Sequence, residues 1–64
     1  MTFYGVRSRF FDRKKDSEAV LLGPVHATVK PETTKKATKD YDEYVDYYHT
    51  LEDALYAVSY VNGG

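Results

Sequence analysis

A chain of 64 residues without a cysteine has to build its fold around one small hydrophobic core. A domain of this size buries only about 60% of the surface that its unfolded chain exposes, so its stability is marginal. Disulfides, a structural metal or self-association usually reinforce such domains. The composition excludes disulfides and thiolate metal sites, and two histidines without a ligand spacing do not predict a zinc site. We therefore expect a single domain, residues 1–64, that forms a homodimer and carries no cofactor or metal.

Three segments alternate aromatic or β-branched residues with polar ones, which is the pattern of half-buried strands. These segments are residues 2–11, 19–30 and 41–48. The polar residues 12–18 predict a hairpin turn between the first two strands. Gly23-Pro24 interrupts the second strand and would bend it, place it at a sheet edge or split it in two. Residues 31–40 have no apolar periodicity and predict a flexible loop.

The C-terminal segment predicts a helix over residues 51–61. Thr50 is a favourable N-cap, Asp53 is at the capping-box position, and Asn62-Gly63 allows a left-handed exit. At 100° per residue, one face of the helix carries Leu51, Ala54, Leu55, Val58 and Val61. We expect this face to pack on the sheet. The predicted fold class is α+β, a small antiparallel sheet of three to four strands packed on one C-terminal helix in the order β-β-β-α.

The two-residue period of a strand predicts which side chains share a face. In the first strand the uncharged face is the better core face, and it consists of Tyr4, Val6, Ser8 and Phe10. In the third strand we expect Val45 and Tyr47 to point inward. The outward face of the first strand then interleaves cations with aromatic rings, namely Phe3, Arg7, Arg9 and Phe11.

Two interpretations of that outward face remain open. Interleaved rings and cations can stack a nucleobase and neutralise a phosphate. The candidate ligand-binding residues would be Phe3, Arg7, Arg9, Phe11, His26 and Lys30. Alternatively, Arg7 and Arg9 pair across the sheet with Asp42, Asp46 or Glu18. The first strand resembles the aromatic-basic strand of RNA-recognition sheets, but it lacks their glycine spacing and the chain is too short for that fold. We therefore do not expect an extended nucleic acid as partner.

Charge is segregated along the chain. Residues 1–39 carry nine basic and four acidic side chains, a formal charge of +5, whereas residues 40–64 carry six acidic and no basic ones, a formal charge of −6. The acidic segment also holds six of the seven tyrosines. Such asymmetry concerns binding partners rather than the fold. The acidic segment either steers a basic partner toward it or is balanced internally by the basic half of the chain.

Tyr56 and Tyr60 are neighbours on the helix surface and lie on the side that faces away from the sheet. Tyrosine is enriched at protein interfaces because it buries a large area while keeping a polar tip. The alternative is that a flanking loop, residues 31–40, covers both rings. The candidate partner-binding residues are Tyr44, Asp46, Tyr48, Glu52, Asp53, Tyr56 and Tyr60.

The motifs that carry catalysis are missing from the sequence. No nucleophile–base motif, phosphate loop or dinucleotide fingerprint occurs, so we do not expect an enzyme. The longest apolar run, Ala19–Leu22, is far shorter than the roughly 20 residues of a membrane span. The N-terminus has no pattern of a secretory signal. We expect a cytoplasmic protein without membrane contact.

These observations favour a non-enzymatic binding protein. Its size and its tyrosine-rich, charge-segregated composition are those expected of a small viral accessory protein that antagonises a host factor through an acidic, tyrosine-rich surface. One alternative is an oligomer that sequesters a nucleotide or another phosphorylated small ligand. A second alternative is a structural accessory domain whose exposed tyrosines only form a homodimer.

Overall fold

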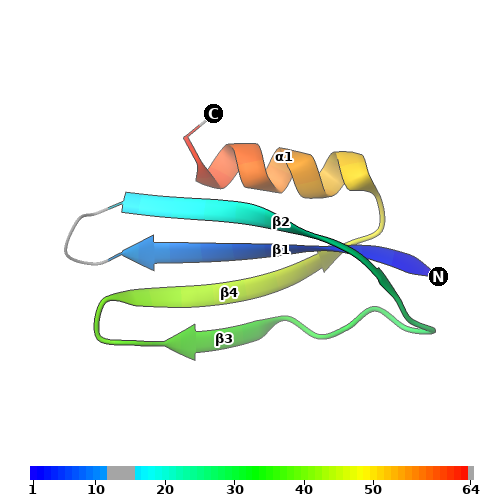
Figure 1. Cartoon of the computed structure of the whole chain (residues 1–64), viewed down its shortest axis with the longest axis horizontal. Helices are drawn as coiled ribbons and strands as arrows, with labels where there is room; N and C mark the ends of the chain where they lie inside the picture. Colours follow the sequence, from blue (N-terminus) through cyan, green and yellow to red (C-terminus); the bar gives the residue numbers. More distant parts are fainter. Residues whose placement is uncertain (12–15, 64) are drawn as a thin grey trace.

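The computed structural model describes residues 1–11 and 16–63. In these residues it forms four strands and one helix, namely β1 (Thr2–Phe11), β2 (Asp16–His26), β3 (Thr34–Ala37), β4 (Tyr41–Tyr48) and α1 (Leu51–Val61). All strand pairs are antiparallel and the order in the sheet is β2-β1-β4-β3. The helix lies along the β2 side of the sheet, with β3 at the opposite edge (Figure 1). The chain therefore has the small α+β architecture predicted from its sequence.

The strand β2 differs in its bounds from the predicted second strand. It begins at Asp16, so residues 16–18 belong to the strand, while residues 12–15 of the predicted turn lie outside the described residues. It ends at His26 and passes through Gly23-Pro24 without splitting. There the pairing with β1 shifts register between Gly5 and Val6, and Gly23 has a φ of 91°, a conformation that favours glycine. Because β2 is an edge strand, it tolerates the proline.

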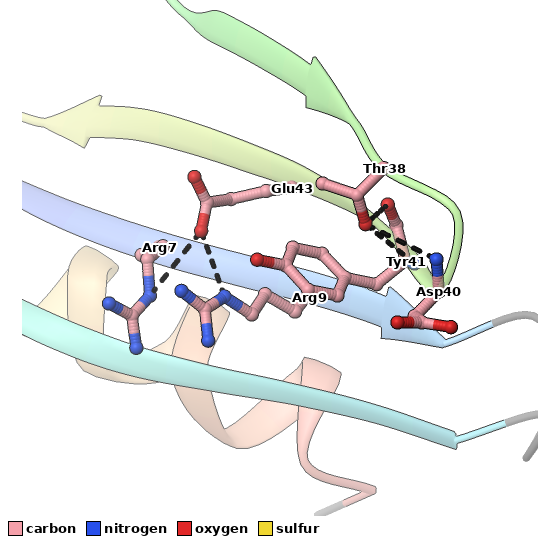
Figure 2. Close-up of polar contacts among 6 residues, drawn as sticks. All are labelled: Arg7, Arg9, Thr38, Asp40, Tyr41 and Glu43. Carbon is pink, nitrogen blue, oxygen red and sulfur yellow. Dashed lines mark hydrogen bonds and ion pairs between the residues drawn. The ribbon is translucent and has the colours of Figure 1, made fainter.

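The prediction of a loop over residues 31–40 is wrong for residues 34–37, which form β3 and pair with β4. This strand has the sequence Thr-Lys-Lys-Ala and is exposed at every position. It buries no side chain and so shows no apolar period, and its lysines are typical of an edge strand. Thr38 closes the hairpin to β4, because its backbone N–H donates to the carbonyl of Tyr41 (2.8 Å) and its Oγ1 accepts from the N–H of Tyr41 (3.1 Å). The hydroxyl of Thr38 is seen beside Tyr41 in Figure 2.

The predicted inward face of β4 is also wrong. The register with β1 places Ser8 opposite Tyr44 and Val6 opposite Asp46. Since Val6 belongs to the core beneath α1, the even-numbered residues of β4 are the ones that share its face. Val45 lies opposite Arg7 on the other side of the sheet, which we call the outer face.

A thin core joins α1 to the sheet. Val6, Ala19 and Ala54 form a buried cluster, against which Tyr4, Tyr48, Val58 and Val61 pack. The expectation that the whole apolar face of the helix packs on the sheet is therefore only partly right, because Leu51 and Leu55 remain 44% and 49% exposed. Helical periodicity places both leucines on the flank of α1 away from the groove, and β2 is the edge strand of the sheet in the described residues.

Phe3 departs from its predicted outward, accessible position. Phe3 is three residues before Val6 on β1, so strand alternation places it on the outer face, as predicted. Its side chain is nevertheless only 1% exposed. Its ring packs against the ring of His49, with the ring centroids 5.2 Å apart. Phe3 is thus a second site of hydrophobic packing, separate from the cluster beneath α1.

Candidate functional site

A groove of about 990 Å³ lies between β4 and α1. β4 contributes Asp42, Tyr44, Asp46 and Tyr48 to it, and α1 contributes Asp53, Tyr56 and Tyr60. Ser8 and Phe10 of β1, the strand between β4 and β2, also line it. Its volume is at the upper end of the roughly 300–1,000 Å³ of small-ligand pockets, so it has room for several side chains of a partner.

The periodicities of the two walls explain why these residues meet. On β4, every second side chain points to the face that carries α1. On α1, residues three and four apart are neighbours, which aligns Asp53, Tyr56 and Tyr60 along one flank. The helix runs antiparallel to β4 and packs mainly on β2 and β1, so it covers only part of this side of β4 (Figure 1).

The groove brings together the whole predicted partner-binding set except Glu52. Glu52 is exposed one helical turn before Tyr56 and does not line the groove. Asp42 and Phe10 line the groove but are missing from the predicted set. Asp42 has the same parity as Tyr44, so strand alternation alone could have found it. Phe10 lies opposite Asp42 in the register between β1 and β4, which the sequence does not reveal.

Two tyrosines of the helix wall are largely exposed. Tyr56 has 74% and Tyr60 has 75% of its surface accessible. The segment 31–40, considered as a cover for these rings, does not cover them. Its Lys35 lies instead over the ring of Tyr44, with Nζ 5.6 Å from the ring centroid.

Three carboxylates make the groove acidic. Among the residues that the structure describes, no lysine or arginine lines the groove beside Asp42, Asp46 and Asp53. Asp46 accepts a hydrogen bond from the hydroxyl of Thr33 (2.8 Å). Burial raises the pKa of Tyr48, and the charge of Asp46 adds to this effect. A raised pKa favours the protonated hydroxyl, which can donate a hydrogen bond.

The outer face carries the arginines of β1. Nε of Arg9 donates to Oε1 of Glu43 over 2.8 Å, and Nε of Arg7 lies 4.0 Å from the same oxygen (Figure 2). The hydrogen bond from Arg9 lowers the pKa of Glu43. The expectation that these arginines pair with Asp42 or Asp46 is wrong, because both aspartates lie on the groove side of β4. Glu18 does lie opposite Arg9 on β2, but Arg9 hydrogen-bonds to Glu43.

The six candidate residues of a nucleotide site do not form one exposed platform. Phe3 is buried, and Arg7 and Arg9 share Glu43. Phe11 packs against Tyr41 at the far end of β1, with ring centroids 5.3 Å apart. At the other end, Nδ1 of His26 lies 3.1 Å from the hydroxyl of Thr2, while Lys30 is exposed beyond the end of β2.

Comparison of the chain with protein-family models, with curated proteins and with solved structures gives no match. Within residues 1–11 and 16–63, no helix has the length and apolar character needed to cross a membrane. The same residues contain no group of three or more histidine, cysteine or carboxylate side chains placed to hold a metal ion.

Proposed function

We propose that this chain is a non-enzymatic binding protein that holds a partner protein in the groove between β4 and α1. The observation that carries the proposal is the exposure of Tyr56 and Tyr60, 74% and 75%, on the wall of a groove with three carboxylates. A tyrosine ring at an interface buries a large apolar area while its hydroxyl still finds a polar partner. Tyrosines at the centre of an interface are frequent hot spots of binding energy.

The charge of the groove supports a basic partner surface. Asp42, Asp46 and Asp53 line it, and within the described part of the chain no cationic side chain lines it with them. A cleft of one sign attracts a partner of the opposite sign, which raises the association rate and makes binding dependent on salt. The tyrosines would supply affinity, and the aspartates would supply steering and specificity.

The test uses the immobilised chain to capture proteins from a lysate. Wild type is compared with the double variant Tyr56→Ala/Tyr60→Ala and with the control Ser59→Ala. The control changes an exposed residue of the same helix that does not line the groove. Alanine has the highest helix propensity, so circular dichroism should show all three proteins folded.

A protein retained by wild type and control but not by the tyrosine variant is then purified and titrated by calorimetry. We expect the tyrosine variant to bind at least tenfold more weakly, a loss of about 1.4 kcal/mol or more. Equal affinity of variant and wild type would reject the groove as the binding site. If light scattering shows a dimer for wild type and a monomer for the tyrosine variant, the groove holds a second copy of the chain, and the proposal of a foreign partner is rejected in favour of a homodimer.

A further inference from the structure

On the outer face of the sheet, β4 binds the side chain of one arginine of β1. Arg9 of β1 lies opposite Glu43 in the register and donates from Nε to Oε1 over 2.8 Å. Its guanidinium carbon also lies 4.8 Å from the ring centroid of Tyr41, two positions before Glu43 (Figure 2). A tyrosine and a carboxylate two residues apart on one strand face thus contact the same guanidinium, one by stacking and the other by a charge-assisted hydrogen bond.

The groove side of β4 repeats this spacing. Asp42, Tyr44, Asp46 and Tyr48 alternate carboxylate and phenol along one face, again two residues apart. On this face, however, β1 supplies no arginine. The residue opposite Asp42 is Phe10, and the residue opposite Asp46 is Val6. Among the described residues, the cation seated over a tyrosine of this face is Lys35, above Tyr44.

We infer that the groove recognises arginine side chains presented by an extended segment of the partner, an inference that rests on the proposed function. Arginine is favoured over lysine because its planar guanidinium can stack on a ring and bind a carboxylate through two parallel hydrogen bonds. Lysine carries a compact charge that can lie over a ring, as Lys35 does over Tyr44, but it has no plane to stack and no pair of parallel donors for a carboxylate. The exposed rings of Tyr56 and Tyr60 on the opposite wall add further stacking surfaces.

The spacing of the carboxylates selects an extended segment. Asp42 and Asp46 are four residues apart on a strand, which corresponds to about 13 Å. Arginines four residues apart in an extended peptide have the same separation. In a helical peptide the same two arginines are separated by a rise of only about 6 Å.

Fluorescence anisotropy with labelled peptides tests this inference on the whole chain. The probe is the peptide Arg-Thr-Val-Thr-Arg, whose β-branched spacer favours an extended backbone. Its controls are the lysine analogue Lys-Thr-Val-Thr-Lys and the isomer Thr-Val-Arg-Arg-Thr, which has the same composition with adjacent arginines. We expect the probe to bind at least fivefold more tightly than either control, and we expect its affinity to fall as salt is raised.

Variants identify the carboxylates involved. Asp42→Asn/Asp46→Asn is expected to weaken binding of the probe about tenfold, since it keeps the shape of both side chains and removes their charge. Glu18→Gln, which removes an exposed carboxylate of β2 opposite Arg9 on the outer face, is the matched control and should leave affinity unchanged. Circular dichroism checks that each variant is folded.

The inference is overturned if the lysine peptide or the isomer binds as tightly as the probe, or if the double asparagine variant binds the probe like wild type. Absence of binding at about 1 mM probe would overturn it as well. These failures differ from a failure of the proposed function. If capture of a partner depends on Tyr56 and Tyr60 but not on Asp42 and Asp46, the groove binds a protein and only the arginine preference is wrong.

Discussion

Glu43 links the arginines of β1 to β4 on the outer face of the sheet. Its carboxylate accepts a hydrogen bond from Arg9 and lies within ion-pair distance of Arg7. Nε of Arg7 is shielded from solvent and has no hydrogen-bond partner, so the charge of Glu43 is its main compensation. Removal of this carboxylate would leave these two neighbouring cations with Glu18, which lies opposite Arg9 on β2, as the remaining acidic neighbour on the strands beside them.

The lowered pKa of Glu43 predicts a pH dependence of stability. In the unfolded chain this carboxyl has its usual pKa of 4.5, and the fold lowers it through the hydrogen bond from Arg9. Ionised Glu43 therefore stabilises the fold above about pH 4.5, and this stabilisation is lost as the pH falls through the lower pKa of the folded state. We expect Glu43→Gln to lower the urea midpoint at pH 7 and to lower it less below pH 4.5.

Exposed Glu32 offers a matched control, because Glu32→Gln removes the same charge away from the two arginines. Urea titrations of the three proteins across this pH range make the comparison. An equal shift of the Glu43→Gln midpoint at both ends of the range would show that the ion pair does not stabilise the fold.

The C-terminal end of α1 is attached to the edge of β2 by polar contacts. The side-chain amide of Asn62 accepts from the backbone N–H of Ala19 (2.8 Å) and donates to its carbonyl (3.1 Å). The hydroxyl of Ser17 donates to the carbonyl of Val61 (2.8 Å). Asn62 therefore satisfies backbone groups that an edge strand would otherwise leave open for pairing with another chain. At the other end, Thr50 caps the helix by accepting from the N–H of Asp53 (3.1 Å), as predicted.

We expect Asn62→Ala to reduce the free energy of unfolding by about 1–2 kcal/mol, because it removes two hydrogen bonds from a partly buried site. Urea denaturation measures this loss. Hydrogen exchange by NMR should in addition show faster exchange of the Ala19 amide. The control Ser59→Ala changes an exposed position of the same helix and should leave both quantities unchanged. Unaltered protection of the Ala19 amide in Asn62→Ala would contradict the role of this contact.

The molecule as a whole is thin. Its Cα atoms extend over 38 × 24 × 12 Å, and the shortest dimension leaves room for a single layer of side chains. In residues 1–11 and 16–63, the buried apolar residues are Phe3, Val6, Ala19 and Ala54. A domain with so small a core is expected to have only about 3–5 kcal/mol of stability. Self-association remains the predicted means of reinforcing it, and light scattering in the capture experiment would detect it.

Phe3→Ala is therefore expected to unfold a large fraction of the chain. The loss of a buried phenylalanine costs about 3–5 kcal/mol, which is comparable with the whole stability of such a domain. Phe3→Leu should give a smaller loss that a urea titration can quantify, because part of the apolar volume is kept. Val29→Ala is the control, since Val29 is 72% exposed and its change should stay within about 0.5 kcal/mol. Native circular dichroism of Phe3→Ala at room temperature would contradict the importance assigned to this ring.

Some elements could be predicted from the sequence because their signals are local. The alternation of tyrosine, valine and acidic residues predicts β4, and the N-cap and apolar spacing predict α1 with the bounds that the structure has. β3 could not be predicted in this way, because an exposed edge strand has no buried face to leave a pattern. For the groove, the exposed tyrosines of α1 and the alternation on β4 were sufficient for most residues. The place of Phe10 in the groove was not predictable, because it results from the pairing of β1 with β4.

Local interactions between near neighbours in the chain account for β1 and β4, for the helix and its cap, and for the alignment of Tyr56 with Tyr60. Long-range pairing accounts for the rest. The sequence shows which residues of β4 share a face, but not which of its two faces carries the helix, because a shift by one residue exchanges them. In the observed register, Asp42 and Asp46 lie on the face of β4 that carries α1, away from the arginines. Glu43 lies opposite Arg9 and accepts its hydrogen bond. The groove exists because α1 covers β2 and β1 and leaves that face of β4 open.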